Sequence, residues 1–366
     1  MKVNSVKLNS FRNISSMEFE ACDGVNVIYG ENAQGKTNIL EAMWLFTGCK
    51  SFRGAKDAEF IKFGEDFSKI NLSFSDNVRD KKAEIIFGKN KKKNVSLNGV
   101  SLNSSSALIG SFYAVIFSPS HLSLIKDGPS ERRRFLDTAL CQLKPSYAEH
   151  LAGYRRALLQ RNALLKDLHL SPQLYDILDS WDDQLARYSA AVISERLKYI
   201  DILSEYSKEI YGGISENKEE FSVTYSRKDI TDINISVRDL YLLSLEKIKE
   251  ARKEDVLMKT TTFGPHRDDL EIMINNVSAR AFGSQGQQRS CALALKLGES
   301  EIIKKITGET PVALLDDVMS ELDERRQDYV LNHINDRQVF LTCCDPSQVL
   351  RLCGGQSFLI KGGEII

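Results

Sequence analysis

The sequence predicts an α/β fold in which both ends of the chain build one domain with mixed and antiparallel sheets, and the middle forms a helical lobe. Three observations carry this prediction. An apolar strand, a glycine-rich loop and an apolar helix follow one another between 25 and 46. Strand-like segments return after 256. From 130 to about 253 helical periodicity dominates. We therefore expect a head formed by 1–129 and 255–366, and a helical lobe formed by 130–254.

Composition places the chain in a broad class. Its 366 residues are 42% hydrophobic and 27% charged, with a net charge of -1, as in a core-forming globular protein of about two domains. Seven scattered cysteines without a C-x-x-C pair argue against a zinc site or a secreted disulfide framework, and fit a reducing cytosol. No apolar run approaches the roughly 20 residues that span a bilayer. We expect a cytoplasmic protein with no membrane partner.

The first strands lie near the N-terminus. Spaced apolar residues up to 28 indicate two or three short strands. From 69 to 115 the pattern alternates again, with a lysine-rich turn at 89–93 and an Asn98-Gly99 hairpin signal. This alternation predicts an antiparallel sheet beside the sheet that contains 25–28.

The middle segment predicts two long helices. Leu151, Tyr154 and Leu165 share one face of the first, which Ser171-Pro172 interrupts. The second begins at about 173. Two interpretations stay open: a short antiparallel arm, or a helical domain with buried stripes.

The last elements return to strands. A helix should begin after Ser284 and run to about 306. An apolar strand at 312–315 is followed by Asp316-Asp317, another strand covers 339–342, and 358–360 is expected to form an edge strand.

The pattern G-x-x-x-x-G-K-[ST] is met in full at 30–37, between a predicted strand and a predicted helix. Glycines let backbone N–H groups approach phosphate oxygens, Lys36 neutralises their charge, and Thr37 offers a hydroxyl to Mg²⁺. The sequence therefore predicts an ATP-Mg²⁺ site. Its expected nucleotide-binding residues are Gly30, Glu31, Asn32, Ala33, Gln34, Gly35, Lys36, Thr37 and Asn38.

Asp316 and Asp317 are candidates for a catalytic role because the chain also contains such a loop. We expect Asp316 to share the metal with Thr37, and Asp317 to polarise the attacking water. Asp317 is shorter than a glutamate in that position would be, which predicts slow hydrolysis.

A third motif narrows the class. Ser284 and Gly286 at a helix start make an anion site, with Gln287 beside them. This segment resembles the signature of ATP-binding-cassette (ABC) ATPases, which closes on the γ-phosphate held by the other subunit. Asp323 lies in a segment that resembles the D-loop of that class. This resemblance implies that the catalytic set is Lys36, Asp316, Asp317, Ser284 and Gly286, with Gln287 and Asp323 contacting nucleotide.

Taken together, the motifs resemble the RecF family of bacterial recombination-repair ATPases, which is related to SMC proteins. The resemblance rests on the segments 11–13, 30–38, 51–53, 129–137, 264–269 and 284–289. It implies an ABC-type P-loop ATPase head with a helical lobe and a short antiparallel arm. It also implies an ATP-dependent homodimer on single-stranded DNA, gaps or duplex junctions, with weak DNA-stimulated ATP hydrolysis. RecO and RecR would be partners in RecA loading, the SOS response and replication restart at the nucleoid.

Some residues keep two interpretations. Arg12 and Asn13 sit on a turn where related ATPases hold nucleotide, but a structural turn fits equally well. We favour a structural or interface role for His266 and Arg267, because no metal-ligand spacing accompanies them. The segment 341–345 occupies the place of a transporter's switch histidine, and no Q-loop glutamine is evident.

Two basic clusters are candidates for DNA contact, although they could instead serve the fold or a nucleotide contact. They are Lys89, Lys91, Lys92 and Lys93, and Arg132, Arg133 and Arg134.

Other classes of protein fit less well. A transporter ATPase subunit should carry a switch histidine, and a monomeric P-loop kinase or NTPase leaves 284–288 unexplained. A non-catalytic role, in which ATP only locks the dimer, also stays open.

Overall fold

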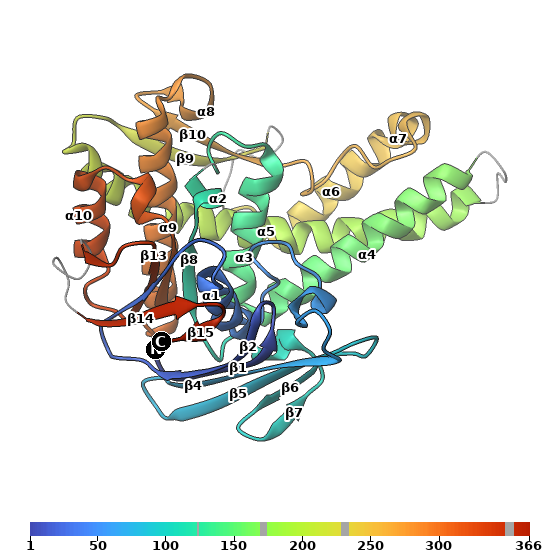
Figure 1. Ribbon diagram of the computed structural model, residues 1–366. Coiled ribbons are helices and arrows are strands. Elements are labelled where there is room, and N and C mark those ends of the chain that lie inside the picture. The colour runs from blue at the N-terminus through green and yellow to red at the C-terminus, as the bar shows by residue number, and fades with distance from the viewer. Residues whose placement is uncertain (123, 169–173, 228–233, 348–354) are drawn as a thin grey trace.

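The computed structural model describes residues 1–122, 124–168, 174–227, 234–347 and 355–366 (Figure 1). The predicted break at Ser171-Pro172 lies outside the described residues. Two six-stranded sheets form the head, and a pair of long helices extends away from it (Figure 1). The predicted α/β class, with mixed and antiparallel sheets, is confirmed.

The first sheet has the strand order β15-β14-β3-β13-β12-β8, and all neighbours are parallel except β14 and β15. Its strands are β3 (Val25–Tyr29), β8 (Ala114–Phe117), β12 (Val312–Asp316), β13 (Val339–Cys343), β14 (Gln356–Lys361) and β15 (Glu364–Ile365). Every residue of β8 and β12 is buried, which explains their unbroken apolar sequences. The expectation of an edge strand at 358–360 is wrong, because β15 pairs outside β14.

The second sheet is antiparallel, with the order β2-β1-β4-β5-β6-β7. Its strands are β1 (Lys2–Phe11), β2 (Ile14–Glu20), β4 (Phe67–Ser75), β5 (Asp80–Gly88), β6 (Asn94–Leu97) and β7 (Val100–Leu102). The predicted hairpin at Asn98-Gly99 is confirmed, with positive φ at both residues. Helix α1 (Lys36–Trp44) packs between the two sheets, since Leu40 and Met43 share a core cluster with Ile70 and Leu314.

The remaining helices cover the parallel sheet and form the arm. They are α2 (Pro119–Leu122), α3 (Pro129–Leu143), α4 (Pro145–Asp167), α5 (Leu174–Ser215), α6 (Val237–Glu250), α7 (Arg252–Met258), α8 (Ala279–Phe282), α9 (Gln285–Thr307) and α10 (Glu324–His333). Short 3₁₀ turns are η1 (Leu45–Thr47), η2 (Asp57–Phe60), η3 (Ser105–Leu108) and η4 (Met319–Glu321).

Helices α4 and α5 run antiparallel. Tyr147 near the start of α4 contacts Arg196 of α5, whereas Arg161 further along α4 contacts Asp182 nearer the start of α5. Figure 1 shows this pair extending from the head, with α6 and α7 beside it. The arm interpretation therefore describes the outer part of these helices.

The inner part of the helices belongs to the main core. One hydrophobic cluster contains Leu151 and Leu203 of the helices together with Val27 and Leu315 of the parallel sheet. A third sheet of β9 (Phe221–Ser226), β10 (Asp269–Ile274) and β11 (Val277–Ser278) also joins the two parts. Strand β9 lies inside the segment expected to be helical. Head and lobe thus differ in their elements but share a core.

Among the helices in the described parts of the chain, none combines the length and the apolar character that crossing a membrane requires.

Candidate functional site

The loop between β3 and α1 is shaped by two glycines with positive φ, 147° at Gly30 and 113° at Gly35. Close neighbours add a second requirement. A Cβ at Gly30 would lie 2.3 Å from the carbonyl oxygen of Ile360, and one at Gly35 would lie 2.8 Å from Oδ1 of Asn13. The chain can therefore turn tightly into α1, which directs the positive end of that helix at the loop and makes an anion-binding cradle.

Lys36, the first residue of α1, lies across this loop and is only 6% exposed. Its Nζ donates to the carbonyl oxygens of Gly30 at 2.6 Å and Glu31 at 3.1 Å. The Sγ of Cys344, after β13, lies 3.7 Å away. The ammonium group is thus held over the loop, where phosphate oxygens would replace carbonyl partners.

Thr37 and Asp316 meet although 279 residues separate them. The Thr37 hydroxyl donates to Oδ1 of Asp316 at 2.7 Å, and Thr342 of β13 donates to the same oxygen at 3.0 Å. Strands β3, β13 and β12 are parallel neighbours, so their carboxyl ends bring these residues to one edge of the sheet. Burial raises the pKa of Asp316.

This pair of oxygen ligands fits Mg²⁺. Magnesium in phosphate sites is usually bound through one or two carboxylates, a hydroxyl and the phosphates of the substrate. Thr37 and Asp316 supply a hydroxyl and a carboxylate at hydrogen-bond distance from one another. The predicted metal residues are therefore placed together.

Asp317 follows the end of β12 in a left-handed conformation, with φ of 53°. Its N–H donates to the Thr342 hydroxyl at 2.9 Å, and its carbonyl accepts from Ser320 at 2.8 Å. This bend turns the chain away from the strand direction at the metal edge. The side chain is half-buried.

The turn between β1 and β2 contacts the glycine loop through Asn13. Oδ1 of Asn13 accepts from Asn38 at 2.8 Å, and Nδ2 of Asn13 donates to the carbonyl of Ala33 at 3.4 Å. Arg12 is engaged elsewhere, because it forms an ion pair with the fully buried Glu41 at 2.9 Å. The structural interpretation of Arg12 gains support from this contact.

Sequence reasoning missed a side chain beside this site. Arg53 donates from Nη1 to Oδ1 of Asn38 at 2.9 Å, and its side chain is 45% exposed. In the sequence, the triplet 51–53 carries only a family resemblance and no predicted contact. The available signal was an arginine close after the loop-plus-helix unit.

The signature residues form a capped helix start. The Ser284 hydroxyl accepts from the N–H of Gln287 at 3.2 Å, and Oε1 of Gln287 accepts from the N–H of Ser284 at 2.8 Å. Nε2 of Gln287 also donates to Glu219 at 2.7 Å. The Ser284 oxygen is the acceptor in this cap, so the hydroxyl hydrogen takes no part in it.

Asp323 lies close to the signature rather than to the glycine loop. It caps α10, and its Oδ1 accepts from the N–H of Arg326 at 2.9 Å. Arg289 of α9 reaches the preceding residues through an ion pair with Glu321 at 2.8 Å. Signature and D-loop therefore form one cluster.

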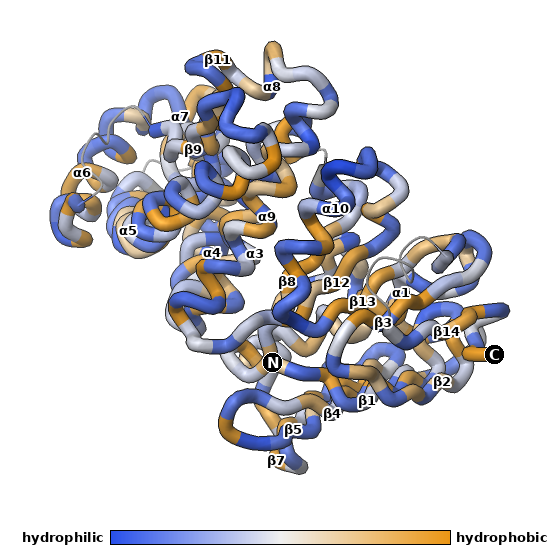
Figure 2. Tube along the Cα trace, turned by 90° about the vertical axis from the view of Figure 1, so that its left-hand side faces the viewer, coloured by the Kyte–Doolittle hydropathy of each residue, from blue (hydrophilic) through white to orange (hydrophobic). Residues whose placement is uncertain are grey.

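This cluster and the glycine loop are apart within one chain. Figures 1 and 2 both place the α8 end of α9 well above α1. Within the described ranges, no hydrogen bond or ion pair joins Ser284, Gly286, Gln287 or Asp323 to residues 30–38. The structure thus separates the predicted catalytic set into two groups.

Burial argues against the predicted DNA contact of Arg132. Arg132 is 2% exposed, donates to both carboxylate oxygens of Asp269, and also donates to carbonyl oxygens within 124–127. Arg133 donates to the Asp268 carbonyl at 2.8 Å, and Arg134 to the Phe52 carbonyl at 2.6 Å. Contacts within the fold account for Arg132, whereas the Arg134 side chain is 45% exposed.

The lysine turn joins β5 to β6 and presents three exposed side chains to a ligand. They are Lys89, Lys91 and Lys92. Lys93 forms an ion pair with Asp57 at 3.2 Å. The turn therefore remains a candidate for phosphate contact.

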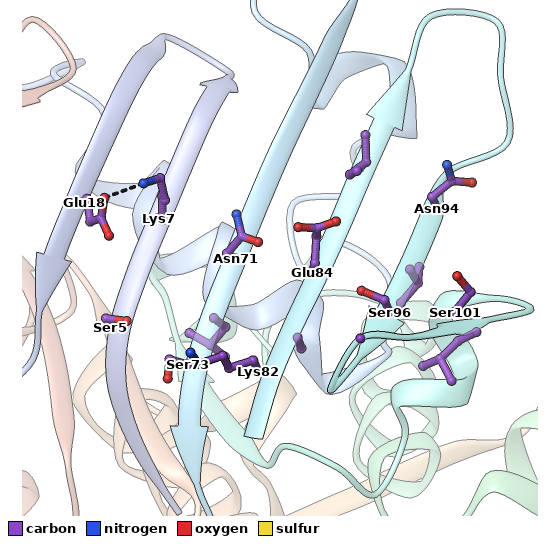
Figure 3. A pocket seen from close by; sticks show the side chains of 16 residues that line it. Ser5, Lys7, Glu18, Asn71, Ser73, Lys82, Glu84, Asn94, Ser96 and Ser101 are labelled. Carbon is purple, nitrogen blue, oxygen red and sulfur yellow. Dashed lines mark hydrogen bonds and ion pairs between the residues drawn. The ribbon is translucent and has the colours of Figure 1, made fainter. Parts of the chain in front are cut away.

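An open hollow of about 810 Å³ lies on the outer face of the antiparallel sheet (Figure 3). Polar side chains such as Asn71, Glu84 and Ser96 point into it, and Lys7 and Glu18 form an ion pair at its rim. None of its lining residues belongs to the glycine loop or the metal edge. The hollow is separate from the candidate site.

His266 takes a structural place. Its Nε2 contacts the Thr261 carbonyl at 3.1 Å, and its Nδ1 contacts the Tyr154 hydroxyl. Burial lowers the pKa of His266 to about 4. The ring thus ties the arm helix α4 to the segment before β10.

Comparisons with known proteins match nearly the whole chain. The family described as "RecF/RecN/SMC N terminal domain" matches residues 2–352. A relative from Agathobacter rectalis, "DNA replication and repair protein RecF", is 42% identical over 94% of this chain and 92% of its own length. A relative of the same name from Lachnospira eligens is 40% identical over 100% and 99%.

Solved structures agree in fold. One described as "Structure of the recombination mediator protein RecF-ATPrS in RecFOR pathway" has a TM-score of 0.93 and 35% identity, covering 99% of this chain and 97% of that one. Its ATP counterpart has a TM-score of 0.90 and 36% identity, covering 100% and 97%. An Smc head domain from Pyrococcus furiosus, at 14% identity and a TM-score of 0.57, covering 100% and 96%, shows likeness of fold alone.

Proposed function

Because the chain belongs to the RecF family of DNA replication and repair proteins, we propose that it is an ATP-dependent DNA-binding protein of recombinational repair. It works as a homodimer that ATP assembles on DNA at gaps or at junctions of single-stranded and duplex DNA. RecO and RecR are its partners in loading RecA, which places it in the SOS response and replication restart. Such a protein acts at the nucleoid in the cytoplasm.

One observation carries the dimer proposal. The glycine loop and the signature cluster are each fully built, but they lie apart in a single chain. A second copy can bring its Ser284 and Gly286 to the nucleotide held over Lys36. Binding of ATP and dimerisation then become one coupled event.

The residues of the loop would act on ATP in distinct ways. Backbone N–H groups of 30–38 and Lys36 hold the phosphates, and Asn13 supports the loop at Ala33. Thr37 and Asp316 would bind Mg²⁺, which neutralises charge on the phosphates. Asp317 would accept a proton from the attacking water. Its short side chain makes hydrolysis slow, so that ATP serves as a switch.

Light scattering tests this function directly. Wild type and Lys36→Arg are each measured with and without ATP-Mg²⁺, and then with gapped duplex DNA. We expect ATP to convert the wild-type monomer to a dimer and to raise its DNA affinity, whereas Lys36→Arg shows neither change. A wild type that stays monomeric with ATP bound would favour the monomeric P-loop enzyme instead.

A further inference from the structure

Arg326, in the first turn of α10, contacts both parts of the signature cluster. Its Nη2 donates to the carbonyl oxygen of Gly286 at 3.0 Å, and its Nε donates to the hydroxyl of Ser290 at 2.9 Å. Its Nη1 forms an ion pair with Asp323. The side chain is 22% exposed. Through these contacts a single guanidinium links α9 to the loop before α10.

Gly286 is shaped to receive this arginine. It lies in helix α9, where no positive φ demands glycine. A Cβ at this position would lie 3.1 Å from Nη2 of Arg326, which is tighter than ordinary contact. The glycine therefore makes room for the guanidinium.

Charge also gathers at this point. Two helices of 23 and 10 residues, α9 and α10, direct their positive ends toward it, and Arg326 adds a full positive charge. Asp323, whose side chain is 54% exposed, pairs with Arg326. Because Asp323 offsets the charge of Arg326, the positive potential that would meet a phosphate of another chain comes from the two helix ends.

We propose that Arg326 is a positioning residue of the composite ATP site, holding the turn at Gly286 and the loop at Asp323 as one unit that meets the partner protomer's nucleotide. This inference rests on the proposed function, because only an ATP-assembled dimer brings this unit to a phosphate. A planar guanidinium suits the task, since it can donate to separate acceptors at once.

The test compares Arg326→Ala and Arg326→Lys with the matched control Arg325→Ala. Arg325 is the neighbouring residue on α10, and its guanidinium contacts the Ile214 carbonyl and Glu216 instead. Three quantities are measured: affinity of the monomer for a fluorescent ATP analogue, the dissociation constant of the ATP-bound dimer, and kcat.

We expect Arg326→Ala to keep nucleotide affinity, because its contacts are remote from the glycine loop. Its dimer dissociation constant should rise and its kcat should fall by roughly tenfold or more, as expected when a charged hydrogen bond is removed. Arg326→Lys should be intermediate, since one ammonium cannot reproduce the fork. Arg325→Ala should match wild type.

Several outcomes overturn the inference. If wild type dimerises with ATP but Arg326→Ala does so equally well, the inference is wrong while the proposed function stands. If wild type itself stays monomeric with ATP, both are wrong. If Arg326→Ala does not fold, Arg326→Lys decides, because it keeps the charge and removes the planar fork of donors. Wild-type dimerisation and kcat in Arg326→Lys would then refute the role.

Discussion

Asp317 combines an unusual backbone conformation with a proposed chemical role. Its φ of 53° lies in the left-handed region, which asparagine and aspartate tolerate better than other side-chain-bearing residues. Asp317→Asn therefore keeps both shape and conformation while removing the base. This substitution should therefore separate ATP binding from ATP hydrolysis.

We expect Asp317→Asn to lower kcat by roughly 100-fold or more, because positioned general bases contribute at least that much. Nucleotide affinity should stay unchanged, and the ATP-bound dimer should persist longer. Single-turnover hydrolysis and light scattering measure the two effects. Unchanged kcat would assign the water to another residue.

His266 makes stability depend on pH. Its Nε2 faces the Thr261 carbonyl, so a neutral ring that accepts the Tyr154 hydroxyl at Nδ1 satisfies both nitrogens. Besides burial, Arg267 and Arg133 also lower the pKa of His266, while Asp255 acts in the opposite direction. Protonation would turn Nδ1 into a donor, so the Tyr154 hydroxyl would have to accept instead of donate.

The folded pKa of about 4 lies below the unfolded value of about 6.5, so the unfolded chain takes up the proton first. The contribution of His266 to stability is complete above about pH 6.5 and is lost as the pH falls toward 4, by about 1.4 kcal/mol per pH unit. We expect urea unfolding of His266→Gln to show a shallower pH dependence. Burial also lowers the pKa of His121 and His333. The contribution of His266 is therefore taken from the difference between wild type and His266→Gln. Equal pH dependences of the unfolding free energy in wild type and His266→Gln would contradict this prediction.

At the scale of elements, Arg132 fixes the start of α3 to β10. It is buried, and its ion pair with Asp269 spans 137 residues of sequence. Nothing local distinguishes Arg132 from its exposed neighbour Arg134, so sequence alone could not separate a fold contact from a DNA contact.

We expect Arg132→Ala to lower the free energy of unfolding by about 3 kcal/mol, as for other broken buried ion pairs. The salt dependence of DNA binding by the folded fraction should stay unchanged. Arg134→Ala is the control, because its side chain is 45% exposed and should cost little stability. If the slope of log DNA affinity against log salt is flatter in Arg132→Ala, this residue belongs to the DNA interface instead.

Elements with local signals were predicted, and those defined by distant partners were not. The loop at 30–37, the strand before Asp316 and the cap at Ser284 follow from short patterns. Strand β9 has six residues between helical segments, and it exists because β10, more than forty residues later, pairs with it. The same limit hid Arg53 and Arg326, whose partners come from other elements.

At the scale of the whole molecule, charge is nearly balanced, so DNA affinity must come from local clusters. With Arg132 buried, the exposed members of the predicted clusters are Lys89, Lys91 and Lys92 of the turn, and Arg134. The turn joins β5 to β6 beside η2, where Lys93 pairs with Asp57.

We expect the triple change to alanine at these lysines to flatten the slope of log affinity against log salt, by about one unit for each DNA phosphate that the turn neutralises in the wild type. ATP binding should be unaffected, since the turn is separate from the glycine loop. Lys2→Ala is the control, an exposed lysine on the same sheet that pairs with Asp23. An unchanged slope would exclude the turn from the interface.

Helix α5 gives the molecule a mechanical property. Tyr211, close to its end, donates to Glu219, which in turn accepts from Gln287 of the signature. The helix has 42 residues and is therefore roughly 63 Å long. For such a rod, a tilt of about 5° at the signature displaces the far tip by about 5 Å. A small rotation of the head around the signature would therefore appear as a larger displacement at the outer tip of the arm.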